Sequence, residues 1–159
     1  MSTTDFIADI GKGKAGELIF REDFPEFLNI NYEDVTGCQK FQIIDSDFIA
    51  KIGLYEIKTN YKDNKILIFE DYTNINNPVS LGWVYKTKAD VIIFLSKETR
   101  TMVFLPFNEG FKDHYKYIRD NTSLVKNKIT IHNGNQWQSA FRRVPFEMLK
   151  GYISIYRKL

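Results

Sequence analysis

Residues 41–58 constrain the fold of this chain more than any other segment, because they combine strand-like patterning with charge. Two apolar runs flank residues 50–53, which we predict to be the turn between two strands. Asp45 and Asp47 lie in the first run, and Glu56 and Lys58 lie in the second. Side chains two positions apart on a strand share a face, so we expect Glu56 and Lys58 to lie together. Pairing of the two strands would bring Asp45 or Asp47 beside Glu56.

The acid–x–Lys pattern has little weight by itself. With 20 acidic residues and many lysines in the chain, roughly two such triplets are expected by chance. Two occur, at 56–58 in a predicted strand and at 63–65 in a predicted turn, where the side chains would point into solvent. A half-buried Glu and Lys need partners to offset desolvation. A cross-strand salt bridge and a metal site both satisfy that need, and the residues alone do not separate them.

The chemistry of phosphodiester cleavage explains why a metal site would group these residue types. Mg²⁺ prefers a few carboxylates, a carbonyl and several waters. Asp47 and Glu56 could each give one oxygen, and the main-chain carbonyl of Ile57 a third, with Asp45 as the alternative acid. The metal would acidify a water and clamp the phosphate. Lys58 would hold or help deprotonate that water, or neutralise the developing charge.

The order of an acid, a short gap and Glu-x-Lys, after a predicted N-terminal helix carrying Glu17, resembles the PD-(D/E)XK nuclease superfamily. That group includes restriction enzymes, archaeal-type Holliday junction resolvases and many phage nucleases. The resemblance spans roughly residues 16–105, and residues 82–95 and 143–145 are also similar to small phage and bacterial members. It implies a restriction-endonuclease-like sheet between helices and divalent-metal-dependent cleavage of DNA.

The resemblance also assigns roles to individual residues. Glu56 and Lys58 match the Glu and Lys of the motif. The first acid of the motif usually precedes an apolar residue, which favours Asp47, with Asp45 in reserve. In resolvase-like members a Glu on the first helix approaches the metal, and Glu17 is the matching position. The chain departs from the pattern because a serine, not a proline, precedes Asp47, and because the gap to Glu56 leaves room only for a tight hairpin.

The length of 159 residues suits one domain over residues 1–159. We predict an α/β fold with a mixed sheet of four to five strands flanked by helices. The strands at 39–50, 54–59 and 65–70 are expected to form an antiparallel meander. The predicted helices are 14–28, 107–119 and 146–153, and the other predicted strands are 31–35, 89–95, 102–105 and a closing hairpin at 129–131 and 139–144.

Cysteine content and hydropathy point to the cytoplasm. Cys38 is the one cysteine, so no internal disulfide can form and a reducing compartment fits. The first residues lack the apolar core of a signal peptide. No run approaches the roughly 18 apolar residues of a membrane span.

Basic residues are the candidate contacts to DNA. The net charge of +2 is too small to imply nucleic-acid binding by itself, so a local patch would have to provide it. Lys112, Lys116 and Arg119 share one face of the helix predicted at 107–119. Arg142 and Arg143 form a second cluster, and we name all five as candidate phosphate contacts.

The leading hypothesis is therefore a Mg²⁺- or Mn²⁺-dependent DNA endonuclease, selective for a structure such as branched DNA. A homodimer is expected because two-fold symmetry pairs two sites for cutting both strands. Glu70 is a candidate to face the same side as Glu56, and Trp83 is expected in the core. The rival hypothesis is a catalytically silent nuclease-like domain that binds nucleic acid or another protein.

Overall fold

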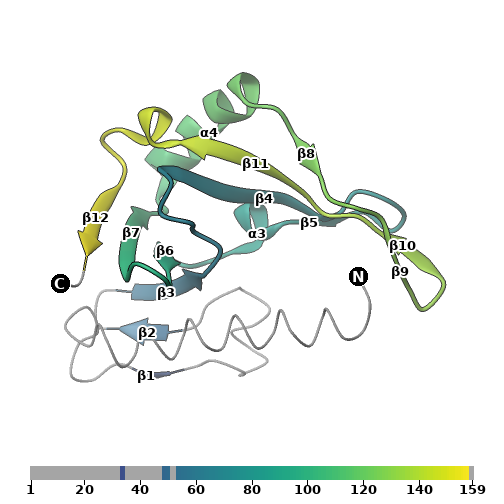
Figure 1. The fold of residues 1–159 in the computed structure, drawn as a ribbon, viewed down its shortest axis with the longest axis horizontal. Coiled ribbons are helices and arrows are strands. Elements are labelled where there is room, and N and C mark those ends of the chain that lie inside the picture. Colours follow the sequence, from purple (N-terminus) through teal and green to yellow (C-terminus); the bar gives the residue numbers. More distant parts are fainter. Residues whose placement is uncertain (1–32, 35–47, 51–52, 158–159) are drawn as a thin grey trace.

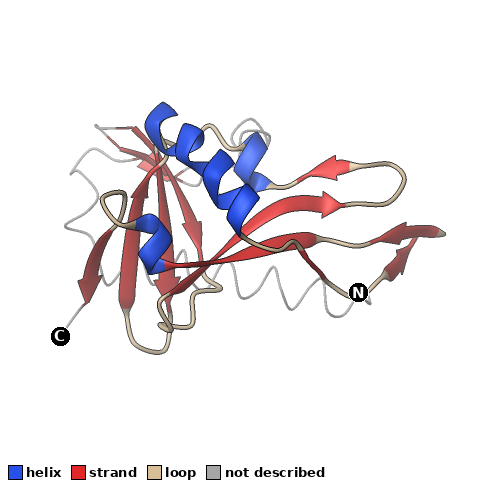
Figure 2. Ribbon diagram, turned by 90° about the horizontal axis from the view of Figure 1, so that it is seen from above, coloured by secondary structure: helices blue, strands red, loops and turns tan. Residues whose placement is uncertain are grey.

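The computed structural model describes residues 33–34, 48–50 and 53–157. These residues form a mixed α/β fold with three sheets and a few helices, which confirms the predicted fold class (Figures 1 and 2). No helix within the described ranges has the length and apolar character needed to cross a membrane. The helix predicted at 14–28 lies outside the described residues.

The largest sheet has six strands in the spatial order β1-β2-β3-β6-β7-β12. Neighbouring strands are antiparallel except β3 and β6, which are parallel, so the sheet is mixed as predicted, with six strands in place of the predicted four to five. The continuous apolar run of β6 is buried from both faces, as is typical of a central strand. The strands are β1 (Glu33–Asp34), β2 (Phe48–Ala50), β3 (Gly53–Lys58), β6 (Val91–Ser96), β7 (Thr101–Pro106) and β12 (Ser154–Arg157).

A second, four-stranded sheet has the order β5-β4-β11-β8 and is antiparallel throughout. Its long strands β4 and β11 run past the first sheet toward a separate two-stranded hairpin, β9–β10 (Figures 1 and 2). The strands are β4 (Ile66–Asn74), β5 (Ser80–Leu81), β8 (Val125–Lys126), β9 (Thr130–His132), β10 (Asn135–Trp137) and β11 (Ala140–Pro145).

The two faces of β4 have different surroundings. Leu67 and Phe69 are fully buried in the core, where Phe69 contacts the rings of Phe111 and Tyr115 on helix α4 (Glu109–Asn121). Ile66, Ile68 and Glu70 alternate with them and are only partly buried, so they occupy the opposite face. The sheet β5-β4-β11-β8 therefore has α4 on one side and an open face on the other.

Local signals explain the helices. Asn108 caps α4 by accepting a hydrogen bond from the Phe111 backbone N–H at 2.9 Å. The short helix α3 (Trp83–Lys86) follows Gly82, where a β-carbon would lie 2.0 Å from the carbonyl oxygen of Glu70. Glycine therefore lets the chain cross β4 closely enough to place Trp83 in the core, at 6% exposure, as expected from the sequence.

Three sequence predictions need correction. β4 does not continue the meander of β2 and β3, because it pairs with β5 and β11 in the second sheet. The hairpin strand opposite β9 is β10, since the turn at Asn133–Gly134 is too tight to pair β9 with β11. The final helix is reduced to the 3₁₀ turn η2 (Phe146–Leu149), after which the chain turns into β12.

Candidate functional site

Glu56 and Lys58 lie together on β3, as the sequence predicted. Lys58 Nζ donates a hydrogen bond to Glu56 Oε1 at 2.6 Å, and only 6% of Glu56 is exposed. The Lys58 ammonium also lies 5.2 Å from the centre of the Trp83 ring. A buried carboxylate is stabilised by an adjacent ammonium, and an aromatic face favours that ammonium further. The pair is therefore a charged group that lies against the apolar core.

The position of this pair follows from the strand pairing. Glu56 and Lys58 are aligned with Ile92 and Phe94 of the parallel strand β6, both of which belong to the core. Neighbouring strands present aligned residues on one face of a sheet. The pair therefore projects from the face that packs beneath β4, while Ile57 is buried on the other face.

The predicted acidic partners of Glu56 cannot be placed beside it. Asp45, Asp47 and Glu17 lie outside the described residues. Within the described ranges, no three His, Cys, Asp or Glu side chains gather closely enough to hold a metal ion. The predicted metal site thus remains a prediction that depends on an acid preceding β2.

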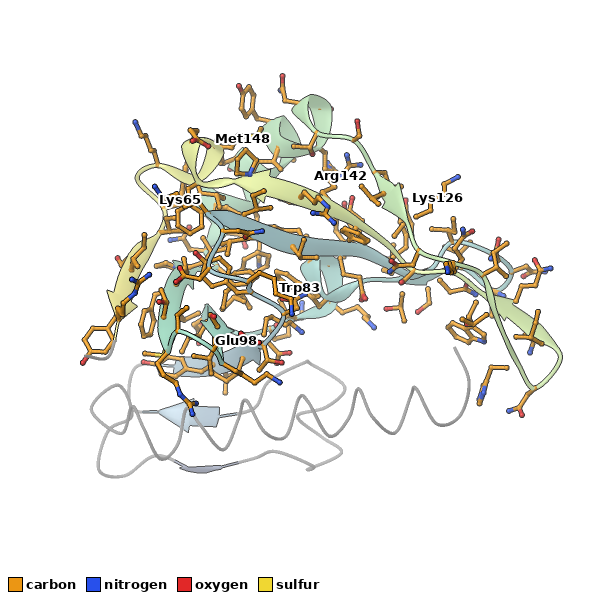
Figure 3. All side chains as sticks on the ribbon, viewed as in Figure 1. Lys65, Trp83, Glu98, Lys126, Arg142 and Met148 are labelled. Atoms are coloured by element: carbon orange, nitrogen blue, oxygen red, sulfur yellow. The ribbon has the colours of Figure 1, made fainter. Side chains whose placement is uncertain are left out.

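A pocket of about 610 Å³ opens beside Lys58. One wall is the open face of β4 and β11, and the other comes from β3, the segment that follows it, and α3. Figure 3 shows Trp83 between β4 and the six-stranded sheet, where it contributes to this second wall. The lining residues are Lys58, Asn60, Lys62, Asn64, Ile66, Ile68, Glu70, Thr73, Trp83, Lys86, Asn127, Ser139, Phe141 and Arg143.

The charged residues of the lining are mostly cationic. Lys58, Lys62, Lys86 and Arg143 carry positive charge, and Glu70 is the acid among the described lining residues. The Thr73 hydroxyl donates to Glu70 Oε1 at 3.1 Å. Such a surface attracts anions. Glu70 was expected to face the same side as Glu56. It shares the pocket with Lys58 but belongs to a different sheet from Glu56.

Arg142 and Arg143 have opposite environments. Arg143 is exposed and lines the pocket. The Arg142 side chain, which Figure 3 shows beside β11, is 13% exposed and pairs with Asp71 through Nε at 2.7 Å. It also donates to the carbonyl oxygens of Thr122 at 2.7 Å and Arg119 at 3.1 Å, just beyond and within the end of α4. Arg143 therefore remains a candidate phosphate contact, whereas Arg142 has a structural role.

The α4 residues predicted to contact DNA lie away from this pocket. Lys112 and Lys116 are exposed on a helix that packs against the other face of β4, and they pair with Glu109 at 3.4 Å and Asp113 at 3.7 Å. They are not among the pocket-lining residues.

The third predicted α4 contact, Arg119, forms a hydrogen bond with a side chain of α3. Arg119 donates to the Tyr85 hydroxyl at 3.2 Å, and this hydrogen bond raises the pKa of Arg119. Burial raises the pKa of the Tyr85 phenol. The structure does not bring Arg119 to the Glu56–Lys58 pair.

Sequence reasoning missed two basic residues of the pocket, Lys62 and Lys86. Lys62 lies in the segment between β3 and β4, and Lys86 ends α3. The spacing of four residues between Lys58 and Lys62 was a weak signal, because β3 ends at Lys58 and strand periodicity does not extend to Lys62. Nothing local to Lys86 indicates that Gly82 carries α3 across β4 toward the pocket.

Comparisons of the chain with protein-family models, curated proteins and solved structures gave no match.

Proposed function

We propose that this chain is a divalent-metal-dependent DNA endonuclease whose site is centred on Glu56 and Lys58. The observation that carries the proposal is the buried Glu56 carboxylate, paired with Lys58 at 2.6 Å beside a cationic pocket. Burial of a charged pair is costly, so its position next to an open, anion-attracting surface favours a chemical role.

The strand pairing supports an acid of the first run as the partner of Glu56. Phe48 of β2 is paired with Tyr55 of β3, and each is directly adjacent in sequence to an acid, Asp47 and Glu56. We therefore propose Asp47 as the first metal ligand. Asp45 is the reserve, two positions earlier.

The residues fit a hard divalent ion, since carboxylate and carbonyl oxygens are the ligands that Mg²⁺ and Mn²⁺ prefer. Glu56, Asp47 and the main-chain carbonyl of Ile57 would hold the ion, with Glu17 assisting. A bound ion would supply an acidified water and charge neutralisation. Lys58 would hold that water or stabilise the negative charge that develops on the phosphate. The basic residues of the pocket would draw in and orient the DNA backbone.

The test is a cleavage assay on supercoiled, branched and single-stranded DNA with Mg²⁺, Mn²⁺ or EDTA. We expect metal-dependent cutting that is lost in Glu56→Gln and falls by about 10²- to 10⁴-fold in Lys58→Met. Mn²⁺ titration calorimetry should show that Glu56→Gln loses metal binding and that Lys58→Met keeps it. A matched control is Glu109→Gln with Lys112→Met, which removes an exposed Glu–Lys pair on α4. Cutting that is equal in Glu56→Gln and the control would refute the site.

A second function has its own support, because the basic side chains of the pocket would attract a nucleic-acid backbone whether or not the Glu56–Lys58 pair performs chemistry. A catalytically silent domain that binds nucleic acid would use the same pocket. DNA binding by the folded protein, with no cutting under any of the metal conditions, would favour this alternative.

A further inference from the structure

We infer that the pocket beside Lys58 binds a single strand of DNA, with a base against Phe141 and the backbone on Arg143, Lys62 and Lys86. This inference rests on the proposed function, because it names the form of DNA that the same site would receive. It is carried by the shape, the charge and the aromatic lining of the pocket.

The open face of β4 and β11 provides an apolar surface with a charged rim. Ile66 and Ile68 of β4 lie beside Phe141 and Arg143 of β11, because Ile68 is paired with Arg143 and Glu70 with Phe141. Phe141 is half-buried, so part of its ring is accessible from the pocket. Single-stranded nucleic acids bind to surfaces of this kind, where aromatic rings stack on bases and cations follow the phosphates.

Phe141 and Arg143 lie within cation–π distance of each other. The Arg143 guanidinium carbon lies 5.9 Å from the centre of the Phe141 ring. A guanidinium in that position adds a cation–π contribution to stacking and presents donors to a phosphate. The ring and the guanidinium together can therefore bind one nucleotide through its base and its backbone.

The second wall supplies further positive charge at the opposite side. Lys62 and Lys86 are exposed, and they come from the segment after β3 and from the end of α3. The wall formed by β11 also lacks negative charge from its own segment, because no acidic residue occurs in the sequence between Asp120 and Glu147. Amide and hydroxyl groups of Asn60 and Ser139 in the lining are suited to the polar edges of a base.

The size of the pocket favours a strand over a double helix. Its volume of about 610 Å³ is in the range of sites that enclose small ligands. A duplex keeps its bases stacked inside and presents only groove edges that are read by an inserted helix or ribbon. A strand with unpaired bases can instead place one base face on Phe141. The site would thus receive single-stranded DNA or the unpaired end of a branched molecule.

The test measures the binding of a fluorescein-labelled oligothymidine by anisotropy, in EDTA so that no cutting occurs. Phe141→Leu keeps the apolar surface and removes the aromatic face, so we expect roughly 5- to 150-fold weaker binding of the strand. Arg143→Gln should reduce the slope of log affinity against log salt by about 0.7, the value for one lost phosphate contact. Lys150→Gln, at an exposed lysine outside the pocket lining, should leave both quantities unchanged. Urea unfolding confirms that each variant is folded.

Two comparisons decide the outcome. A duplex of the same length should bind more weakly than the single strand and should be insensitive to Phe141→Leu. Equal binding of duplex and strand, or wild-type strand binding by Phe141→Leu, would overturn the inference. Full competition by inorganic phosphate, with no effect of Phe141→Leu, would also overturn it and indicate a phosphate site. Strand binding that depends on Phe141 in a protein that never cuts would preserve this inference and reject the endonuclease proposal.

Discussion

Replacing Arg142 by Met should destabilise the fold, whereas the same change at the neighbouring Arg143 should not. Arg142 links three elements, because its side chain pairs with Asp71 of β4 and donates to the carbonyl oxygens of Arg119 and Thr122 at the end of α4. The Asp71 side chain is only 2% exposed. Met keeps much of the volume of Arg142 and removes every donor.

The magnitude follows from the charge left behind. Removing one partner of a buried ion pair costs about 3–5 kcal/mol, because the other charge stays buried without compensation. The Tyr115 hydroxyl still donates to the other carboxylate oxygen of Asp71, so we place the loss near the lower end, at about 3 kcal/mol. For a chain of 159 residues this corresponds to a melting temperature lowered by roughly 6–12 °C.

Urea unfolding followed by circular dichroism measures this difference. Arg143→Met is the matched control, and its free energy of unfolding should stay within about 0.5 kcal/mol of the wild type. Adding Asp71→Asn to Arg142→Met should recover part of the loss, because the uncompensated charge is gone. Equal stability of Arg142→Met and Arg143→Met would refute the role assigned to the buried ion pair.

Three further changes test the backbone and the buried network. Gly82→Ala should lower the free energy of unfolding by about 1–3 kcal/mol or more, because its β-carbon would meet the carbonyl oxygen of Glu70; thermal melting checks this. Gly134→Ala should cost about 1–2 kcal/mol in the same assay for a different reason, since space is open there but φ is +77°. Burial, and then the hydrogen bond to Asp71, raise the pKa of Tyr115, so the neutral phenol stabilises the fold below pH 10 and that contribution is lost as pH rises further. Unfolding between pH 9 and pH 11 should therefore show a total loss of about 1.4 kcal/mol, most of it above pH 10, that is absent in Tyr115→Phe.

Local patterns predicted the elements whose signals lie within a few residues. The apolar run of β6 and the adjacent β7 were found from composition alone. A helix was predicted at 107–119 with a basic face, and the structure places α4 at Glu109–Asn121, where Phe111, Tyr115 and Ile118 form the buried face. The Glu56–Lys58 pair was also predictable from a local pattern. Residues i and i+2 of one strand share a face, whichever strands lie beside it.

The partner of a strand was not predictable in this way. The pattern of β4 identified a strand, but it did not show that β4 leaves β3 and pairs with β11, some seventy residues later in the chain. The pairing of β4 with β11 buries Leu67 and Phe69 in the core that they share with α4. The hydrophobic periodicity of the sequence does not indicate this pairing. The pocket was missed as a consequence, since its walls come from β3, α3, β4 and β11 and meet only through this long-range pairing.

Once β11 is known to be a strand, the alternation of side chains between its two faces explains the contrast between Arg142 and Arg143. Adjacent residues of a strand point to opposite faces, so the two arginines could not both reach one ligand. Ala140 and Val144 share the parity of Arg142 and are fully buried, so Arg142 must enter the core and requires the Asp71 carboxylate there. Phe141 lies on the same face of β11 as Arg143. Because it is a large apolar residue, the sequence alone does not show which face of β11 is buried. The position of Phe141 at the pocket, instead of the core, is the feature that makes the open face of β11 a candidate surface for a base.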